Sequence, residues 1–197
     1  MVKAAVDKWK LKKWFEIIAP ALFKEKQIGE TVANDYRQLL GRTLDVSLAE
    51  LANDPKLQRI KLRFKITEVK GERALTTFLG HVITQDYEHS LGRRRTSKIY
   101  SNQTVETKDG KKVVVKCFLV TADKINTARR NAMRKKLHET ISAIAKNENF
   151  EDFINSVIYG KVNAETKKAV HKIYPVRHAV VQKTEMPQQA TAAESKQ

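Results

Sequence analysis

Three groups of basic side chains stand out in the sequence, and their residue types and spacing suit the binding of phosphate. In the first group, Arg59, Lys61, Arg63 and Lys65 alternate with apolar residues. Because successive side chains of a β-strand point to opposite faces, we expect a strand with all four cations on one face. Neighbouring like charges repel one another, whereas a phosphate backbone laid across them makes the same charges favourable. We therefore predict an RNA contact on this strand, with a simple solvated face as the alternative.

The second group is the run Arg93-Arg94-Arg95, which is followed by Lys98 and lies in an expected loop. An arginine side chain presents a planar set of donors that matches two phosphate oxygens, and it also stacks on bases. Basic runs occur in localisation signals and in flexible exposed loops as well, so the run alone does not decide between these alternatives. Together with the basic strand, the run favours contact with RNA.

The third group lies on the polar face of an expected helix and consists of Arg129, Arg130, Arg134, Lys135 and Lys136. Glu139 is the only acidic residue between positions 124 and 146. A basic amphipathic helix also suits an anionic lipid surface. However, the apolar stripe of this helix contains Ala128, Ala132 and Ala145 and has no aromatic anchor. We therefore expect the stripe to pack on a protein core rather than on lipid.

The beginning of the chain adds Lys10, Lys12 and Lys13, which lie around two tryptophans. An indole ring can stack on exposed bases or on a neighbouring protein. We expect Trp9 to make such an external contact. Trp14 adjoins an expected strand, so burial in the core is an open alternative for this residue.

The charge of the whole chain supports a polyanionic partner. Its 197 residues include 38 Lys and Arg against 22 Asp and Glu, a formal net charge of +16. Such an excess repels itself in the free protein and favours association with nucleic acid, because each neutralised phosphate releases counterions. A generic basic surface is the alternative, and the grouping of the charges argues against it.

Catalysis, metal binding and a bound cofactor are not predicted. Cys117 is the only cysteine and lies in an apolar run, so we expect no disulfide and an unreactive thiol. The five histidines lack the spacing of metal ligands, and there is no glycine-rich nucleotide-binding motif or serine nucleophile motif. The apolar runs are shorter than the roughly 20 residues of a membrane span, and no signal peptide is recognisable. We expect a cytoplasmic protein without a membrane partner.

The periodicity of the sequence predicts an α+β fold, in which a β-barrel-like, curled sheet of short strands precedes a helical segment. The expected strands cover residues 15–19, 60–66, 74–84, 98–106, 113–120 and 176–181. The expected helices cover residues 47–53, 125–145, 149–160 and 163–173. These elements divide the chain into a basic arm with the first strand (1–20), a β-rich RNA-binding body (21–122), a helical segment with a closing strand (123–181) and a disordered tail (182–197).

A series of short motifs runs in one order from about residue 8 to residue 181. The motifs are Lys12-Lys13-Trp14-Phe15, Gly41-Arg42, Val69-Lys70-Gly71-Glu72-Arg73, Asp86-Tyr87, Arg93-Arg94-Arg95, Thr107-Lys108-Asp109-Gly110, Ala132-Met133-Arg134-Lys135 and Ile173-Tyr174-Pro175. This series resembles the S3Ae family of archaeal and eukaryotic small-subunit ribosomal proteins. The lack of long terminal extensions is typical of the archaeal members.

The resemblance implies a structural component of the small ribosomal subunit, located on the platform near the messenger exit and active in translation and subunit assembly. Its implied partners are small-subunit rRNA, neighbouring ribosomal proteins and messenger RNA near the exit. The implied rRNA contacts among the matched residues are Lys12, Lys13, Arg93, Arg94, Arg95, Arg134 and Lys135. Two other functions stay open, a free-standing RNA chaperone or regulator and an RNA-modifying enzyme, although we find no active-site residues for the latter.

Overall fold

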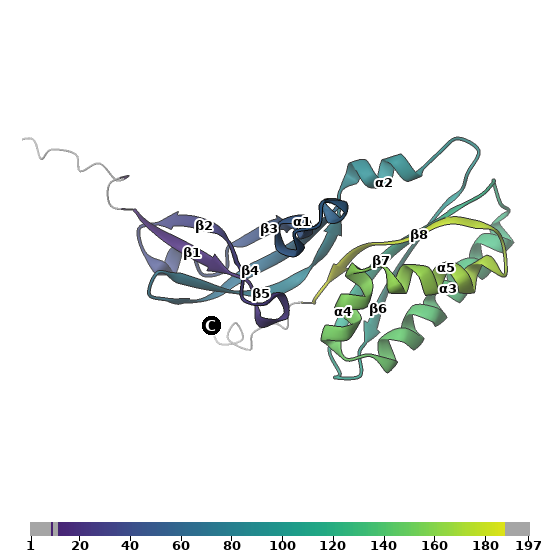
Figure 1. Ribbon diagram of the computed structural model, residues 1–197. Helices are drawn as coiled ribbons and strands as arrows, with labels where there is room; N and C mark the ends of the chain where they lie inside the picture. The colour runs from purple at the N-terminus through teal and green to yellow at the C-terminus, as the bar shows by residue number, and fades with distance from the viewer. Residues whose placement is uncertain (1–8, 10–11, 188–197) are drawn as a thin grey trace, which may run out of the picture. The chain divides into compact units, whose positions relative to one another are not determined.

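The computed structural model describes residue 9 and residues 12–187 of the chain (Figure 1). The chain divides into two compact units, Met1–Leu79 and Gly80–Gln197, which we call unit 1 and unit 2. Strand β5 (Arg73–Ile83) passes through the boundary between them. Within the described residues, no helix has the length and apolar character needed to cross a membrane.

Unit 1 is a sheet with the strand order β2-β1-β5-β4-β3. Its strands besides β5 are β1 (Lys13–Ile18), β2 (Gln27–Ala33), β3 (Thr43–Ser47) and β4 (Ile60–Lys70). The connections contain helix α1 (Leu48–Ala52) and short 3-10 turns at Ala21–Phe23, Tyr36–Gln38 and Pro55–Leu57. Strand β1 runs parallel to β5 and antiparallel to β2, and β3 runs antiparallel to β4. The sequence predicted β1, β4 and β5 but not β2 and β3.

The alternation of side chains in β4 provides much of the core of unit 1. Leu62 and Phe64 are fully buried, whereas Lys61 on the opposite face is exposed. The ring of Phe64 lies 5.5 Å from that of Phe23 and 6.1 Å from that of Phe78, both in edge-on arrangements. Such aromatic pairs stabilise a core beyond the burial of apolar area alone. The predicted separation of apolar and basic residues on the two faces of this strand is therefore confirmed.

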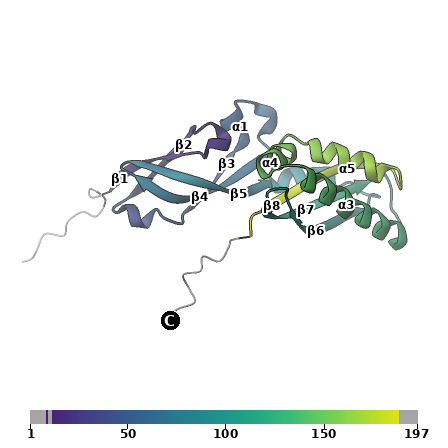
Figure 2. The same cartoon turned by 90° about the horizontal axis from the view of Figure 1, so that it is seen from below.

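Unit 2 combines an antiparallel sheet with helices that cover one of its faces (Figures 1 and 2). The end of β5 pairs with β8 (Val176–Glu185), which is followed in the sheet by β7 (Lys112–Thr121) and β6 (Lys98–Glu106). The helices on that face are α3 (Thr127–Asn147), α4 (Phe150–Ile158) and α5 (Lys161–His171). Helix α2 (Gln85–Leu91) lies apart from them, and its Glu88 accepts hydrogen bonds from Tyr100 of β6 and Gln182 of β8. Helix α3 packs on β6, and α5 packs on β8.

The helices of unit 2 follow the expected periodicity with one difference. Met133, Leu137 and Ile141, each four positions apart, form the buried stripe of α3. Ala128 and Ala132, which we expected in this stripe, are exposed. Ala132 is one position away from Met133, which rotates it by about 100° around the helix axis and away from the sheet. Of the three alanines expected in the stripe, Ala145 is buried, whereas Ala128 and Ala132 belong to the outward surface of α3.

The α+β fold class is confirmed, but the expected β-barrel-like curled sheet is wrong. Among the described strands, no pairing joins β2 to β3 at the edges of unit 1, and none closes the sheet of unit 2. Strands β6 to β8 bury one face against helices, so this sheet forms a core without closing on itself. The helical segment thus completes the core of its own strands rather than following a finished β-rich body.

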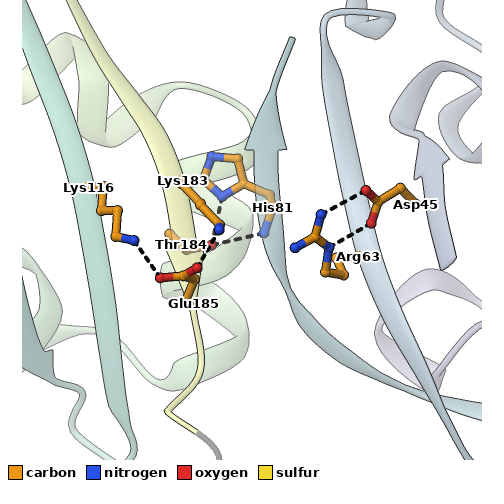
Figure 3. A network of polar contacts seen from close by, with 7 residues as sticks. All are labelled: Asp45, Arg63, His81, Lys116, Lys183, Thr184 and Glu185. Carbon is orange, nitrogen blue, oxygen red and sulfur yellow. Dashed lines mark hydrogen bonds and ion pairs between the residues drawn. The ribbon is translucent and has the colours of Figure 1, made fainter. Parts of the chain in front are cut away.

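The last strand is longer than predicted. Strand β8 extends to Glu185, so residues 182–185 belong to the sheet and not to a disordered tail. The carboxylate of Glu185 lies 2.8 Å from Nζ of Lys116 on β7 and also pairs with Lys183 (Figure 3). These two lysines lower the pKa of Glu185. The expected segment boundaries at residues 20 and 122 stay a prediction.

Candidate nucleic-acid interface

The arginine run forms a tight turn between α2 and β6. The backbone N–H of Thr96 donates to the carbonyl oxygen of Arg93 over 3.4 Å, and its hydroxyl donates to the same oxygen over 2.7 Å. Arg95 has a φ of 67°, a conformation that glycine adopts more easily than other residues. The side chains of Arg93, Arg94 and Arg95 are exposed. We call residues 93–96 the arginine turn.

Three segments of unit 2 meet where the arginine turn enters β6. The carbonyl oxygen of Ser97 accepts the N–H of Thr121 over 3.1 Å, and its hydroxyl oxygen accepts the N–H of Ile125 over 3.3 Å. The N–H of Ala122 donates to the carbonyl oxygen of Pro175 over 3.1 Å. These bonds connect residues 93–98, 121–130 and 172–178, which we call the basic end of unit 2.

The basic end is rich in cations and poor in acid. Asp123 is the only acidic residue in its three segments. Against it stand Arg93, Arg94, Arg95, Lys98, Lys124, Arg129, Arg130, Lys172 and Arg177. The guanidinium of Arg129 lies 5.7 Å from the ring of Tyr174, a cation–π contact that connects the first turn of α3 to the segment before β8. The Nε of Arg130 is buried and has no hydrogen-bond partner within the described part of the chain.

The fold thus brings two of the three predicted basic groups together. The arginine turn precedes β6, and the first turn of α3 follows β7, so the whole β6–β7 hairpin separates them in sequence. The hydrogen bonds of Ser97 place them at one end of unit 2. Clustered arginines that are not neutralised by acids repel one another, and an anionic ligand with several phosphates removes this repulsion.

Two predicted contact residues of unit 2 also serve the fold itself. The Nζ of Lys98 donates to the carbonyl oxygen of Glu88 over 3.1 Å and lies 5.7 Å from the ring centre of Phe118. The Nε of Arg134 donates to the carbonyl oxygen of Tyr100 over 3.1 Å, on edge strand β6. Lys135, by contrast, is simply exposed. The RNA contacts of Lys98, Arg134 and Lys135 stay a prediction.

The basic face of β4 in unit 1 contains one carboxylate that the sequence did not reveal. Asp45 on β3 lies opposite Arg63, with Oδ1 2.7 Å from Nε and Oδ2 2.9 Å from Nη2 (Figure 3). Lys61 and Lys65 have no ion-pair partner among the residues that the structure describes. Arg59 directly precedes the strand and is exposed. The face keeps an excess of cations, but Arg63 is neutralised.

The basic arm at the beginning of unit 1 lies only partly within the structure. Lys10 is outside the described residues. The Nζ of Lys12 lies 4.1 Å from the ring centre of Trp9, and Lys13 is exposed at the start of β1. Trp14 is 60% exposed, so the alternative of core burial is wrong for this residue. Both tryptophans present a ring surface on which a base can stack.

The chain matches known proteins along nearly its whole length. The model of the Ribosomal S3Ae family matches residues 1–190. The chain belongs to the S3Ae family. It is 42% identical over 180 residues to "Small ribosomal subunit protein eS1" of Saccharolobus islandicus (strain L.S.2.15 / Lassen #1), which covers 91% of this chain and 86% of that protein. The proteins with the same name from Saccharolobus solfataricus and Archaeoglobus fulgidus are each 40% identical, over 93% and 96% of this chain and 88% and 90% of theirs.

Family membership makes this S3Ae chain a structural protein of the small subunit of the cytoplasmic ribosome, with archaeal relatives, and not an enzyme. Its buried polar side chains have structural roles. Burial raises the pKa of Cys117 to about 12, so its thiol stays protonated. The hydroxyl of Ser101 lies 2.7 Å from Nε2 of His138, but Ser101 is only 4% exposed and cannot meet a substrate. The described residues contain no group of three metal-ligating side chains.

Sequence reasoning missed several members of the basic end of this S3Ae protein. Lys124, Lys172 and Arg177 stand singly among uncharged or acidic neighbours, so neither a run nor a period marks them. Their common feature is position: Lys124 lies between β7 and α3, Lys172 directly follows α5, and Arg177 lies at the start of β8. Only the pairing of the strands shows that the three segments of the basic end meet.

Proposed function

We propose that this S3Ae protein binds small-subunit rRNA through the basic end of unit 2 and through the outward face of β4 in unit 1. The observation that carries the proposal is the junction at Ser97, which holds the arginine turn beside the first turn of α3. The cations gathered there repel one another in the free protein. Phosphates of a folded RNA neutralise them and release counterions, which drives binding.

The mode of recognition is positioning by phosphate contacts rather than reading of a sequence. Arginine and lysine contacts to phosphates fix the orientation of a protein on RNA but carry no base information. Specificity then comes from the tertiary shape of the rRNA and from a few stacked bases, for which the exposed rings of Trp9 and Trp14 are suited. The protein acts as a clamp on folded rRNA in this proposal.

We further propose that the protein lies on the platform of the small subunit near the messenger exit, beside neighbouring ribosomal proteins. The resemblance of its motifs to the S3Ae family supports this location. The exposed surface of unit 1 around Tyr36 and Leu40, which are 52% and 47% exposed, suits a protein neighbour. Contact with messenger RNA near the exit belongs to the same proposal.

A co-sedimentation experiment with two matched variants tests the proposal. In the first variant, Arg93, Arg94 and Arg95 are changed to Glu. In the second, three exposed lysines near the opposite end of unit 2, Lys108, Lys112 and Lys146, are changed to Glu. Each variant lowers the formal net charge from +16 to +10, since three side chains change by two charges each. We expect the arginine variant to be lost from small subunits in a high-salt sucrose gradient and the lysine variant to be retained.

The same gradient separates the ribosomal role from that of a free-standing RNA chaperone. The wild-type chain should stay with small subunits at close to one copy each. If the wild type remains at the top of the gradient in moderate salt, the proposed stable binding is wrong. If both variants are retained equally, the basic end does not bind the rRNA. Circular dichroism of each variant checks that the fold is intact.

A further inference from the structure

The beginning of β8 carries an ionisable group in the middle of the basic end. His178 pairs in register with Val120 of β7, and Val120 pairs with Lys98 of β6. Arg177 and His178 are both exposed. Lys167 is exposed on α5, which packs on β8, and Arg93 is exposed in the arginine turn. The hydrogen bond from Ala122 to Pro175 holds this end of β8 beside the arginine turn and the end of β7. A second histidine, His171, lies at the same end, where its Nδ1 accepts the N–H of Val176 over 3.2 Å.

The electrostatics around His178 are one-sided. The pKa of His178 is lowered by partial burial and then by the charges of Lys167, Arg177 and Arg93. These cations come from α5, from β8 itself and from the arginine turn, and no carboxylate from these elements acts to raise the pKa. A group of like charges that lacks an internal counterion gains free energy when an anion enters it.

We propose that Lys167, Arg177 and His178 form, together with Arg93, a binding site for an RNA phosphate at which His178 takes up a proton as the phosphate binds. This inference rests on the proposed function and specifies one contact within it. The guanidinium groups supply paired donors to the phosphate oxygens, and the ammonium of Lys167 adds a third cation. The negative charge of the phosphate offsets the positive potential that the cations create at the imidazole. Protonation of the ring is then favoured, and the imidazolium has a further N–H donor for the phosphate.

Proton uptake gives the site a signature that ordinary basic contacts lack. Lysine and arginine keep their charge between about pH 5.5 and pH 8, so their contribution to RNA binding is constant over that range. A histidine that is neutral in the free protein and charged in the complex makes binding tighter as the pH falls. We expect the affinity to rise about tenfold across this range, which corresponds to an average net uptake of about 0.4 proton over these 2.5 pH units.

The test measures binding of the full chain to a fluorescein-labelled oligouridylate across this pH range. Uracil does not titrate there, so the pH dependence comes from the protein. In His178→Gln the rise of affinity at low pH should disappear. His178→Lys should bind at high pH as tightly as the wild type binds at low pH. His89→Gln, an exposed histidine on α2 that does not act on His178, should behave as the wild type.

The outcomes separate this inference from the proposed function. If the wild type fails to bind RNA at any pH, the proposed function itself is wrong. If the wild type binds and His178→Gln keeps the full pH dependence, RNA binding stands and the phosphate site at His178 is wrong. The salt dependence of binding is an independent readout. Lys167→Gln and Arg177→Gln should each make the slope of log affinity against log salt shallower by about one, because each removes one phosphate contact. Unchanged slopes would also overturn the site.

Discussion

His81 on β5 and Thr184 on β8 are joined twice through a single hydroxyl (Figure 3). The backbone N–H of His81 donates to Oγ1 of Thr184 over 3.1 Å, and Nδ1 of the ring lies 2.7 Å from the same oxygen. The other ring nitrogen, Nε2, lies 3.3 Å from the carbonyl oxygen of Val181. A neutral ring with its proton on Nε2 satisfies all these groups, because Nε2–H then donates to Val181 and Nδ1 accepts the hydroxyl of Thr184.

This arrangement predicts that the protein loses stability in mild acid. Burial lowers the pKa of His81 from 6.5 to about 4, although the Val181 bond acts in the opposite direction. Between these values the unfolded chain binds a proton that the folded chain does not, so the free energy of unfolding falls as the pH falls from 6.5 to about 4. The total loss is about 3 kcal/mol.

Urea unfolding of the wild type and of His81→Gln at about pH 7 and about pH 4 measures this contribution. Glutamine does not titrate, so the variant should lose about 3 kcal/mol less between the two pH values than the wild type loses. Equal losses in the two proteins would show that His81 does not respond to pH in the way its burial indicates.

Gly80, the residue before His81, should not tolerate a side chain. A Cβ at this position would lie 2.0 Å from the carbonyl oxygen of Thr184, which is a backbone atom of the paired strand. We expect Gly80→Ala to destabilise the protein by about 3 kcal/mol, because the β5–β8 pairing must open to admit the methyl group. Gly29→Ala is the control, since nothing lies within 4 Å of its Cβ position. Thermal unfolding measures the melting temperature of each variant. An equal fall of the melting temperature in both variants would disprove this steric account.

The sequence predicted the elements whose signal is local. Strand β4 shows its period of two, and the structure places Leu62 and Lys61 on opposite faces as expected. Helix α4 begins at Phe150, one residue after the expected start at 149. These features depend on neighbours in the chain, which a pattern of residues records.

Features that depend on distant residues could not be predicted. Asp45 neutralises Arg63 from a strand that the sequence did not reveal. Gln182 was assigned to a disordered tail, yet its Nε2 donates to Oε2 of Glu88 on α2 over 2.6 Å. In the same way, the three segments of the basic end are brought together by backbone hydrogen bonds such as that from Ala122 to Pro175. No spacing in the sequence records these contacts.

The left-handed conformation of Arg95 offers a way to separate stability from binding. Arg95→Gly and Arg95→Ala both remove the cation, but only glycine adopts a φ of 67° without strain. We expect the glycine variant to be more stable than the alanine variant by about 1 kcal/mol, since a left-handed conformation costs other residues about that much. Both variants should bind RNA more weakly than the wild type and to the same extent. Wild-type RNA affinity in both would mean that the charge of Arg95 is not used.

Asp45 should limit RNA binding by the basic face of β4. Asp45→Asn removes the negative charge that pairs with Arg63, so we expect tighter binding of small-subunit rRNA and a steeper dependence on salt. The stability should change by less than about 1 kcal/mol, because the pair is 39% and 41% exposed. Glu106→Gln, which removes a carboxylate that pairs with exposed Lys112 in unit 2, controls for the change in net charge. If RNA affinity increases equally in both variants, the effect comes from the net charge alone and not from Arg63.

Photo-crosslinking from the arginine turn tests the central claim most directly. A variant with benzoylphenylalanine in place of Arg94 is assembled into small subunits. A second variant with the same substitution at Lys146, near the other end of α3, serves as the comparison. Irradiation should attach the Arg94 position to small-subunit rRNA at a higher yield than the Lys146 position, because the basic end lies against phosphates in this account. If the Arg94 position crosslinks only to protein, or not at all, the basic end is not the RNA-binding surface.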